Sequence, residues 1–475
     1  MIRPLLSFAA FASLTLAGGG QAHRVSTDQA PRPIGYTRSV LPNGLVVLVS
    51  EDHSVPLVAI EVAYHVGSMV DTPGHTGYAH LFEHMMFEGS RDLAPGEYKS
   101  VIQRAGGFNQ GSTDPDRQIY RTVVASNMLP TVLWMEADRM ATLLERMDQQ
   151  RLDAERSIIR GERLSQIENV PFGAADLLTL AALYPPGHPF HQSPIGTPAD
   201  LASASLDDLR AFYKKYYVPN NAVVSICGDV TAAQARDLVA RYFGPIPRGA
   251  PVSLPATQLV RMPAEQRLVF QDARGVAPRL RIAWPTVGYG NADKFALEAL
   301  SALLGSDRGG RLRNAVVGPA PLAANVRVGH YDNEKNGVFQ IEIFGRPGTS
   351  LTRLEQTVDS VLSDLPRHPP TREDIREYAN RVADSTVIGL QPESARADIL
   401  ATGEQFTHDP VDYARQVAAR ERVKPADVLR VAARYLNAPR MVMSMVPTGK
   451  LDAISKPDLP YVDVTQRTST VGGAQ

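Results

Sequence analysis

Two histidines and a glutamate in the segment GYAHLFEHMMFEGS have the types and spacing that metal-dependent hydrolysis requires. At 100° per residue on a helix, taking His80 as zero, His84 lies at about +40° and Glu83 at about −60°, so all three share one arc. Two imidazoles one turn apart can chelate a metal ion, and the carboxylate beside them can reach a water on that ion. This H-x-x-E-H pattern is the inverted form of a zinc-peptidase helix motif, and it favours a metal site over two histidines packed in a core.

A third metal ligand must come from elsewhere, because a catalytic zinc ion takes three protein ligands and keeps one position for water. The chain has one cysteine, Cys227, which excludes thiolate ligand sets and intrachain disulfides. The segment ERSIIRGE contains Glu155 and Glu162, whose seven-residue spacing returns them to within about 20° of one helix face. One could bind the metal and the other could orient a histidine ring. Spacing alone leaves the choice between them open, and an ordinary solvated helix face would show the same pair.

The elements that must position these residues follow from local patterns. Asn43-Gly44 separates two β-prone runs, 36–41 and 45–49, which is a strong hairpin signal. Apolar runs predict further strands over 55–66 and 222–227. Periodicity predicts helices over 76–87, 96–104, 123–146, 149–167 and 206–217.

The order of elements repeats in the second half of the chain. Beyond the proline-rich stretch GPIPRGAPVSLPATQ, strands are expected near 267–270 and 279–284 and a helix over 292–304. The segment LRVAARYLNAPRMVMSMVPTG also resembles LRAFYKKYYVPNNAVVSICGDV of the first half. Two related α+β halves are therefore expected. The predicted division is a metallopeptidase domain over 36–245, a linker over 246–258, a second domain without metal over 259–450, and a polar tail over 451–475, expected to be mobile from Lys456.

Composition narrows the partners and the location of the protein. Lysine and arginine total 49 and aspartate and glutamate 50, a net charge of −1 that gives no global attraction to nucleic acid or an anionic membrane. Residues 1–22 combine Arg3, an apolar run and small residues, which is the order of a signal peptide. No later run reaches the ~18 apolar residues of a membrane span. Export, to a bacterial periplasm, is therefore expected.

The motif and its surroundings resemble the pitrilysin/insulinase family of inverted-motif zinc metallopeptidases, in its short two-domain form like the mitochondrial processing peptidase β subunit. The similar segments are VGSMVDTPGHTGYAHLFEHMMFEGS, AGGFNQGSTDPDRQIY, ERSIIRGE and SPIGTPADLASASLDDLRAFYKKYYVPNNAVVSICGDV. The similarity is strong over 38–245 and looser to about 447. It implies two homologous α/β domains, each a mostly antiparallel sheet with helices packed on it, that together form one half of a clamshell.

The resemblance also implies roles for individual residues. One zinc ion per chain would be bound by His80, His84 and Glu162, with Glu155 in support. Glu83 would be the general base that takes a proton from the zinc-activated water and passes it to the leaving amine. Asn109 would lie beside the edge strand on which the substrate peptide is laid.

The closing half of the clamshell usually supplies an arginine and a tyrosine that hold the substrate backbone. Here GGRLRNAVVGPAPLAANV places Arg313 where the arginine is expected, but Ala324 takes the tyrosine's place. A partner subunit with an intact pair, in a heterodimer or a homodimer, is therefore expected. The predicted function is zinc-dependent endopeptidase hydrolysis of unfolded peptides or small proteins. The alternatives are a scaffold or peptide-binding subunit of the same family and a metal-binding protein without turnover.

Overall fold

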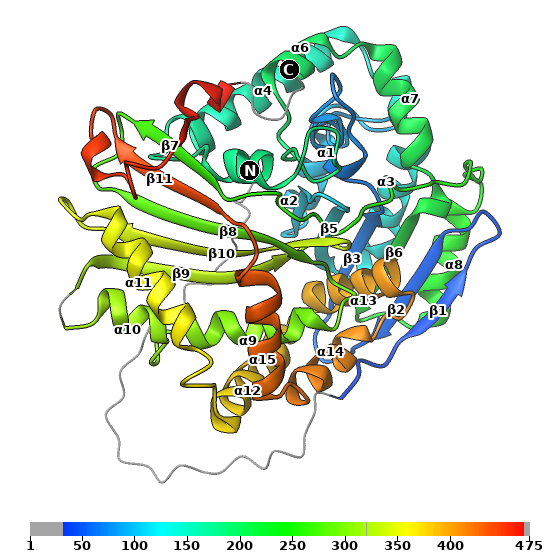
Figure 1. Cartoon of the computed structure of the whole chain (residues 1–475). Helices are drawn as coiled ribbons and strands as arrows, with labels where there is room; N and C mark the ends of the chain where they lie inside the picture. Colours follow the sequence, from blue (N-terminus) through cyan, green and yellow to red (C-terminus); the bar gives the residue numbers. More distant parts are fainter. Residues whose placement is uncertain (1–31, 320, 470–475) are drawn as a thin grey trace.

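The computed structural model describes residues 32–319 and 321–469. The expected signal peptide lies outside these residues. The chain builds two sheets of six strands, one from each half (Figure 1). The first sheet has the strands β1 Thr37–Val40, β2 Val46–Glu51, β3 Leu57–Tyr64, β4 Phe108–Thr113, β5 Gln118–Ala125 and β6 Ala222–Gly228. The second has β7 Gln266–Asp272, β8 Arg279–Val287, β9 Ala323–Asp332, β10 Asn336–Gly345, β11 Met441–Pro447 and β12 Val462–Asp463.

The two sheets share one topology over five of their six strands. Their strand orders are β1-β2-β6-β3-β5-β4 and β12-β7-β11-β8-β10-β9, so β2, β6, β3, β5 and β4 correspond to β7, β11, β8, β10 and β9, while the outer strands β1 and β12 come from opposite ends of the chain. The pairs β2–β6, β7–β11 and β7–β12 are parallel and the other pairs are antiparallel. The expected fold class, two homologous domains with mostly antiparallel sheets, is confirmed.

Helices pack on both sheets. Those of the first half are α1 Tyr78–Met85, α2 Glu97–Arg104, α3 Leu129–Thr142, α4 Gln149–Arg163, α5 Ala175–Leu183, α6 Pro198–Ser203, α7 Leu206–Tyr216 and α8 Ala232–Phe243. Those of the second half are α9 Asp293–Gly305, α10 Arg311–Val317, α11 Leu351–Asp364, α12 Arg372–Gly389, α13 Glu393–Thr407, α14 Asp412–Glu421 and α15 Pro425–Val431. Among the described residues, no helix is both long and apolar enough to cross a membrane.

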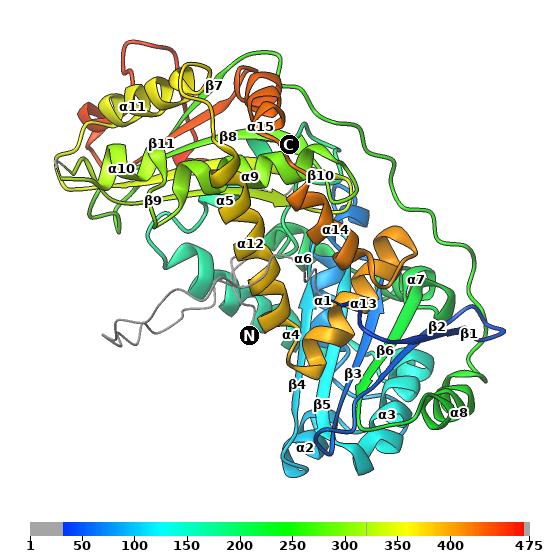
Figure 2. The same ribbon diagram turned by 90° about the horizontal axis from the view of Figure 1, so that it is seen from below.

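The halves exchange one helix each. Helix α13 of the second half lies against β3 and β6 of the first sheet, in both views (Figure 2). Ala397, Leu400 and Ala401 of α13 form a buried cluster there with Ala59 and Cys227. Helix α5 of the first half lies in turn against β8 and β11 of the second sheet. Each sheet therefore buries one face against a helix of the other half, which removes apolar surface of both halves from water.

Local signals explain where several elements begin and turn. Gly44 has φ +91° in the turn between β1 and β2, a conformation that glycine adopts without strain. Helices α7, α8 and α12 each begin with a capping box, in which a serine or threonine and the third residue after it satisfy the first backbone N–H groups. The proline-rich segment from residue 247 to 262 forms neither helix nor strand and joins α8 to β7 as a long extended trace in Figure 2.

Two expectations were wrong in part. The helix expected over 123–146 begins only at Leu129, because residues 118–125 form β5 and pair with β3 and β4 on either side. The tail is bound to the second domain through residue 469, where Val464 is buried and β12 pairs with β7.

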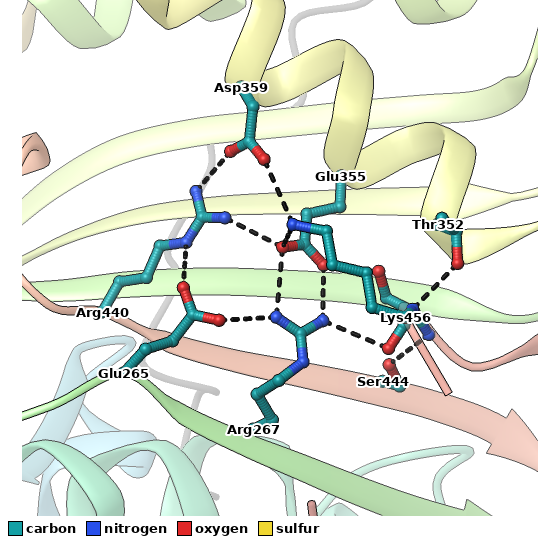
Figure 3. Close-up of polar contacts among 9 residues, drawn as sticks. Glu265, Arg267, Thr352, Glu355, Asp359, Arg440, Ser444 and Lys456 are labelled. Carbon is teal, nitrogen blue, oxygen red and sulfur yellow. Dashed lines mark hydrogen bonds and ion pairs between the residues drawn. The ribbon is translucent and has the colours of Figure 1, made fainter. Parts of the chain in front are cut away.

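A buried ionic network holds the start of this tail (Figure 3). Lys456 Nζ lies 2.7 Å from Glu355, a fully buried carboxylate that also binds Arg267 at 2.6 Å and Arg440 at 2.9 Å. Burial would raise the pKa of Glu355, but the hydrogen bonds from Arg267, Lys456 and the Ser455 hydroxyl outweigh it and hold the pKa at about 2. The tail stays bound since a buried charge without its partners is strongly destabilising.

Candidate metal centre and active site

Helix α1 carries the H-x-x-E-H residues, and its first turn is fixed by buried polar groups. Gly77, at its N-terminal boundary, has φ +86° and donates its backbone N–H to the Asp71 carboxylate at 2.8 Å. Asp71 is buried, and loss of solvation raises its pKa well above the ordinary value. These contacts set where the helix begins and hence which way His80, Glu83 and His84 face.

His80 and His84 converge with Glu162 of α4. One ligand atom of each lies within 4.8 Å of the others. Glu162 Oε2 is 3.7 Å from His80 Nε2 and 3.5 Å from His84 Nε2, and the two imidazole planes are perpendicular. Two imidazole nitrogens and one carboxylate oxygen are the donor set of a catalytic zinc site. The three residues can therefore hold a metal ion.

The state of His80 fits a metal ligand. Its side chain is 2% exposed, and neither ring nitrogen has a hydrogen-bond partner among the described residues. Burial, reinforced by the charge of His84, lowers the pKa of His80 well below its ordinary value, so the ring is neutral at pH 7. A buried imidazole without a partner is costly, and coordination of its Nε2 would offset that cost.

Glu155 occupies a different position from Glu162. Its Oε2 lies 3.1 Å from Nδ1 of His84, the nitrogen on the other side of the ring from the converging atoms. Burial alone would lower the pKa of His84, but hydrogen bonds to Glu155 and Glu162 raise it to about 9. Glu162 therefore lies among the converging ligand atoms and Glu155 lies behind the His84 ring, a difference that their spacing left undecided.

Glu83 lies on α1 against strand β4. Its carboxylate Oε2 accepts a 2.8 Å hydrogen bond from the Thr113 hydroxyl. Burial raises the pKa of Glu83, and the bond from Thr113 opposes that rise. A carboxylate with a raised pKa beside a metal-binding group has the properties of a general base.

Strand β4 is the edge of the first sheet, and Asn109 lies on it. Side chains alternate along a strand, so Asn109, Gly111 and Thr113 share one face. That face lies toward α1, because a Cβ at Gly111 would come 2.9 Å from Cγ of Glu83. The sequence assigned no role to Thr113, although the two-residue steps from Asn109 to Gly111 and from Gly111 to Thr113 are a signal that could have indicated one.

Arg313 lies away from these residues, on α10 of the second domain. It donates to Asn325 at 3.0 Å and pairs with Asp307 at 3.1 Å. It lines a cavity of about 720 Å³ between α9, β9 and α12. Tyr331 and Tyr378 line the same cavity, a juxtaposition that chain order did not reveal.

A second group of possible ligands, Glu298, His330 and Asp332, lies in the second domain. Protein cations already neutralise its carboxylates. Arg420 binds both oxygens of Glu298 at 2.7 and 2.9 Å, and Lys294 lies 2.8 Å from Asp332. This group is therefore part of an ion-pair network.

The fold and the H-x-x-E-H helix define the class, a two-domain α+β protein of a peptidase family. Residues 46–180 match the family model described as "Insulinase (Peptidase family M16)", and residues 203–382 match "Peptidase M16 inactive domain". The chain belongs to the pitrilysin/insulinase family, peptidase family M16.

Similar proteins of known or assigned class agree with this membership. The zinc protease PqqE of Helicobacter pylori is 27% identical over 409 residues, which cover 83% of this chain and 89% of that protein. The β subunit of the mitochondrial processing peptidase of Blastocladiella emersonii is 26% identical over 275 residues, 56% of each chain. A solved protease structure from Helicobacter pylori has a TM-score of 0.81 at 23% identity and covers 87% of this chain and all of that one. A Pseudomonas fluorescens M16 inactive-domain structure has a TM-score of 0.77 at 19% identity, over 87% and 98% of the two chains.

Proposed function

We propose that this chain is a zinc-dependent endopeptidase. The observation that carries the proposal is the convergence of His80, His84 and Glu162 within 4.8 Å, with the Glu83 carboxylate on the same helix as the two histidines. The names of its relatives, zinc proteases among them, support the same class.

His80, His84 and Glu162 would hold the zinc ion, and Glu155 would orient the ring of His84. When bound, zinc lowers the pKa of a water ligand to about 7 and polarises the substrate carbonyl. Glu83 acts as the base: as the water oxygen adds to the carbonyl carbon, Glu83 takes one proton from that water. It then returns the proton to the amide nitrogen as the C–N bond breaks.

The substrate is an unfolded peptide or small protein, because no described strand pairs with the outer side of β4, which can accept an extended strand through backbone hydrogen bonds. Asn109 on that strand is placed to contact the peptide. Arg313, which lines the cavity in the second domain, contacts the substrate in the assembled enzyme. In that assembly a partner subunit supplies an arginine and tyrosine pair. We propose further that the protein is exported to the periplasm.

The test compares wild-type protein with Glu83→Gln on a panel of unstructured fluorogenic peptides, with zinc measured by atomic absorption. Glu83→Gln is expected to keep zinc and lose hydrolysis, whereas Glu421→Gln, a matched change at the exposed end of α14, should keep both. Unchanged hydrolysis in Glu83→Gln would remove Glu83 from the mechanism. Zinc binding without cleavage in any condition would favour the non-catalytic alternative.

The partner is tested separately. Purified chain alone is expected to hydrolyse peptides poorly and to gain activity when the protein that copurifies with the native chain is added. Full activity of a monomer would contradict the need for a partner.

A further inference from the structure

Thr113 is the described residue that donates a hydrogen bond to the proposed base. Its Oγ1 lies 2.8 Å from Oε2 of Glu83. A threonine hydroxyl has one proton to donate and can also accept, whereas an ionised carboxylate can only accept. Whether that proton is directed to Glu83 depends on whether the other group in contact with the hydroxyl donates to it or accepts from it.

Gln118, at the start of β5, settles that direction. Its Nε2 lies 2.6 Å from the carbonyl oxygen of Ala79 and 2.7 Å from Thr113 Oγ1. Its Oε1 accepts from the hydroxyls of Tyr120 at 2.8 Å and Tyr217 at 2.7 Å. The reversed amide would place oxygen against the Ala79 carbonyl, so only this orientation satisfies all four contacts.

The buried amide of Gln118 thus donates to the Thr113 hydroxyl. Since the hydroxyl accepts from Gln118, its own proton is directed to Glu83. The same carboxylate side chain packs on Gly111, where even a methyl group would come 2.9 Å from Glu83 Cγ. Two residues on one face of β4 therefore restrict the base from two sides.

We propose that Thr113 is a positioning residue for the general base. Oriented by Gln118, its hydroxyl fixes the Glu83 carboxylate in the place from which it accepts and returns the proton. This inference rests on the proposed function. It also links the edge strand that would bind the peptide to the group that handles the proton.

A structural hydroxyl would affect folding, whereas a positioning hydroxyl affects turnover. Thr113→Val keeps the side-chain shape and removes the donor. A hydrogen bond to a charged group is strong enough that kcat should fall roughly 10- to 100-fold, with KM and zinc content unchanged. Thr113→Ser restores the hydroxyl and should restore most of kcat. Thr407→Val, which removes a hydroxyl that bonds the Gly403 carbonyl in α13, is the matched control and should leave kcat unchanged.

Gln118→Glu tests the direction of the two hydrogen bonds, from the Gln118 amide to the Thr113 hydroxyl and from that hydroxyl to Glu83. The new carboxylate accepts rather than donates at this position, so it draws the Thr113 proton away from Glu83 and should lower kcat as Thr113→Val does. If this variant does not fold, Thr113→Val and Thr113→Ser decide the matter.

Crystal structures of the metal-free wild type and Thr113→Val give a readout independent of activity. In the variant, the Glu83 carboxylate should leave its position or occupy several rotamers, while the rings of His80 and His84 stay in place. An unmoved Glu83 with wild-type kcat overturns the proposal, and so does a serine variant as slow as the valine variant. If zinc-loaded wild type cleaves nothing, the proposed function fails. The position of Glu83 in the metal-free crystals still shows whether Thr113 holds its carboxylate in place.

Discussion

The carboxylate of Glu155 lies 3.1 Å from Nδ1 of His84, while Nε2 of the same ring faces Glu162. One histidine thus contacts two glutamates of α4 through opposite nitrogens. The Glu155 contact fixes the ring's orientation and makes it a better ligand, because a carboxylate hydrogen-bonded to one imidazole nitrogen increases the basicity of the other.

Glu155→Gln should therefore weaken zinc binding without removing a ligand. We expect a loss of about 10- to 100-fold in zinc affinity, measured by competition with a chromophoric chelator. Asp153→Asn, an exposed acidic residue two positions earlier on α4, is the matched control and should leave zinc affinity unchanged. Equal affinity for Glu155→Gln and wild type would show that this contact does not support the site.

Chelation should destabilise the wild-type protein, because a metal that binds only the folded state stabilises that state by mass action. With free zinc at about 100 times its dissociation constant, the stabilisation is about 2.7 kcal/mol. Differential scanning calorimetry should show a lower Tm after chelator treatment of wild type. Glu162→Gln should show no such response, and the wild type should take up about one zinc per chain. A second zinc would mean that Glu298, His330 and Asp332 bind metal despite the cations on them.

Much of the candidate site could be predicted from the sequence. The arc of His80, Glu83 and His84 needs only a helix, and local periodicity predicted that helix. Spacing could not separate the positions of Glu155 and Glu162, because both lie on one face of α4 and their difference arises from how α4 packs against α1. Only the resemblance to the family assigned them different roles. The role of Thr113 could not be predicted for a similar reason, since it depends on how β4 packs against α1.

The fold was predictable at the level of two related halves but not of their contacts. Residues 118–125 have an apolar content that suits helix or strand, and pairing with β3 and β4 decided the outcome. The polar tail gave no sign of its anchor, because Lys456 binds Glu355 about a hundred residues earlier in the chain. The exchange of α5 and α13 is equally non-local.

Asp116 should make stability depend on pH. This residue, buried between β4 and β5, accepts the backbone N–H of Glu334 from the second domain, and burial raises its pKa to about 6. The unfolded chain has an ordinary aspartate pKa near 3.9, so between about pH 4 and 6 the folded state binds more protons. The contribution of Asp116 to stability is therefore fully present below about pH 4 and is lost as pH rises through 6.

The measurement compares the free energy of unfolding of wild type and Asp116→Asn by urea titration at pH 4.5 and 7. The asparagine variant lacks this titration, so it should gain about 2 kcal/mol relative to wild type between the two pH values. Asp92→Asn, an exposed aspartate near the start of α2, should track wild type at both. A constant difference between Asp116→Asn and wild type would contradict the raised pKa.

The exchanged helices should hold the two halves together without the linker. A protease site inserted after the exposed Ala256 allows the chain to be cut in its extended segment. The fragments should still elute as one species on size-exclusion chromatography, since α13 buries Leu400 and Ala401 against the first sheet and α5 contacts the second. Arg281 adds an ion pair at 2.6 Å to Asp176 of α5.

Ala401→Glu tests the cause of this association. A charge placed in the dry contact between α13 and the first sheet would be buried without a partner, so the cut variant should separate into two fragments. The uncut variant, compared by circular dichroism, shows whether each half still folds. If cut wild-type protein separates as readily as cut Ala401→Glu, the association does not depend on the exchanged helices, and the linker must hold the halves together.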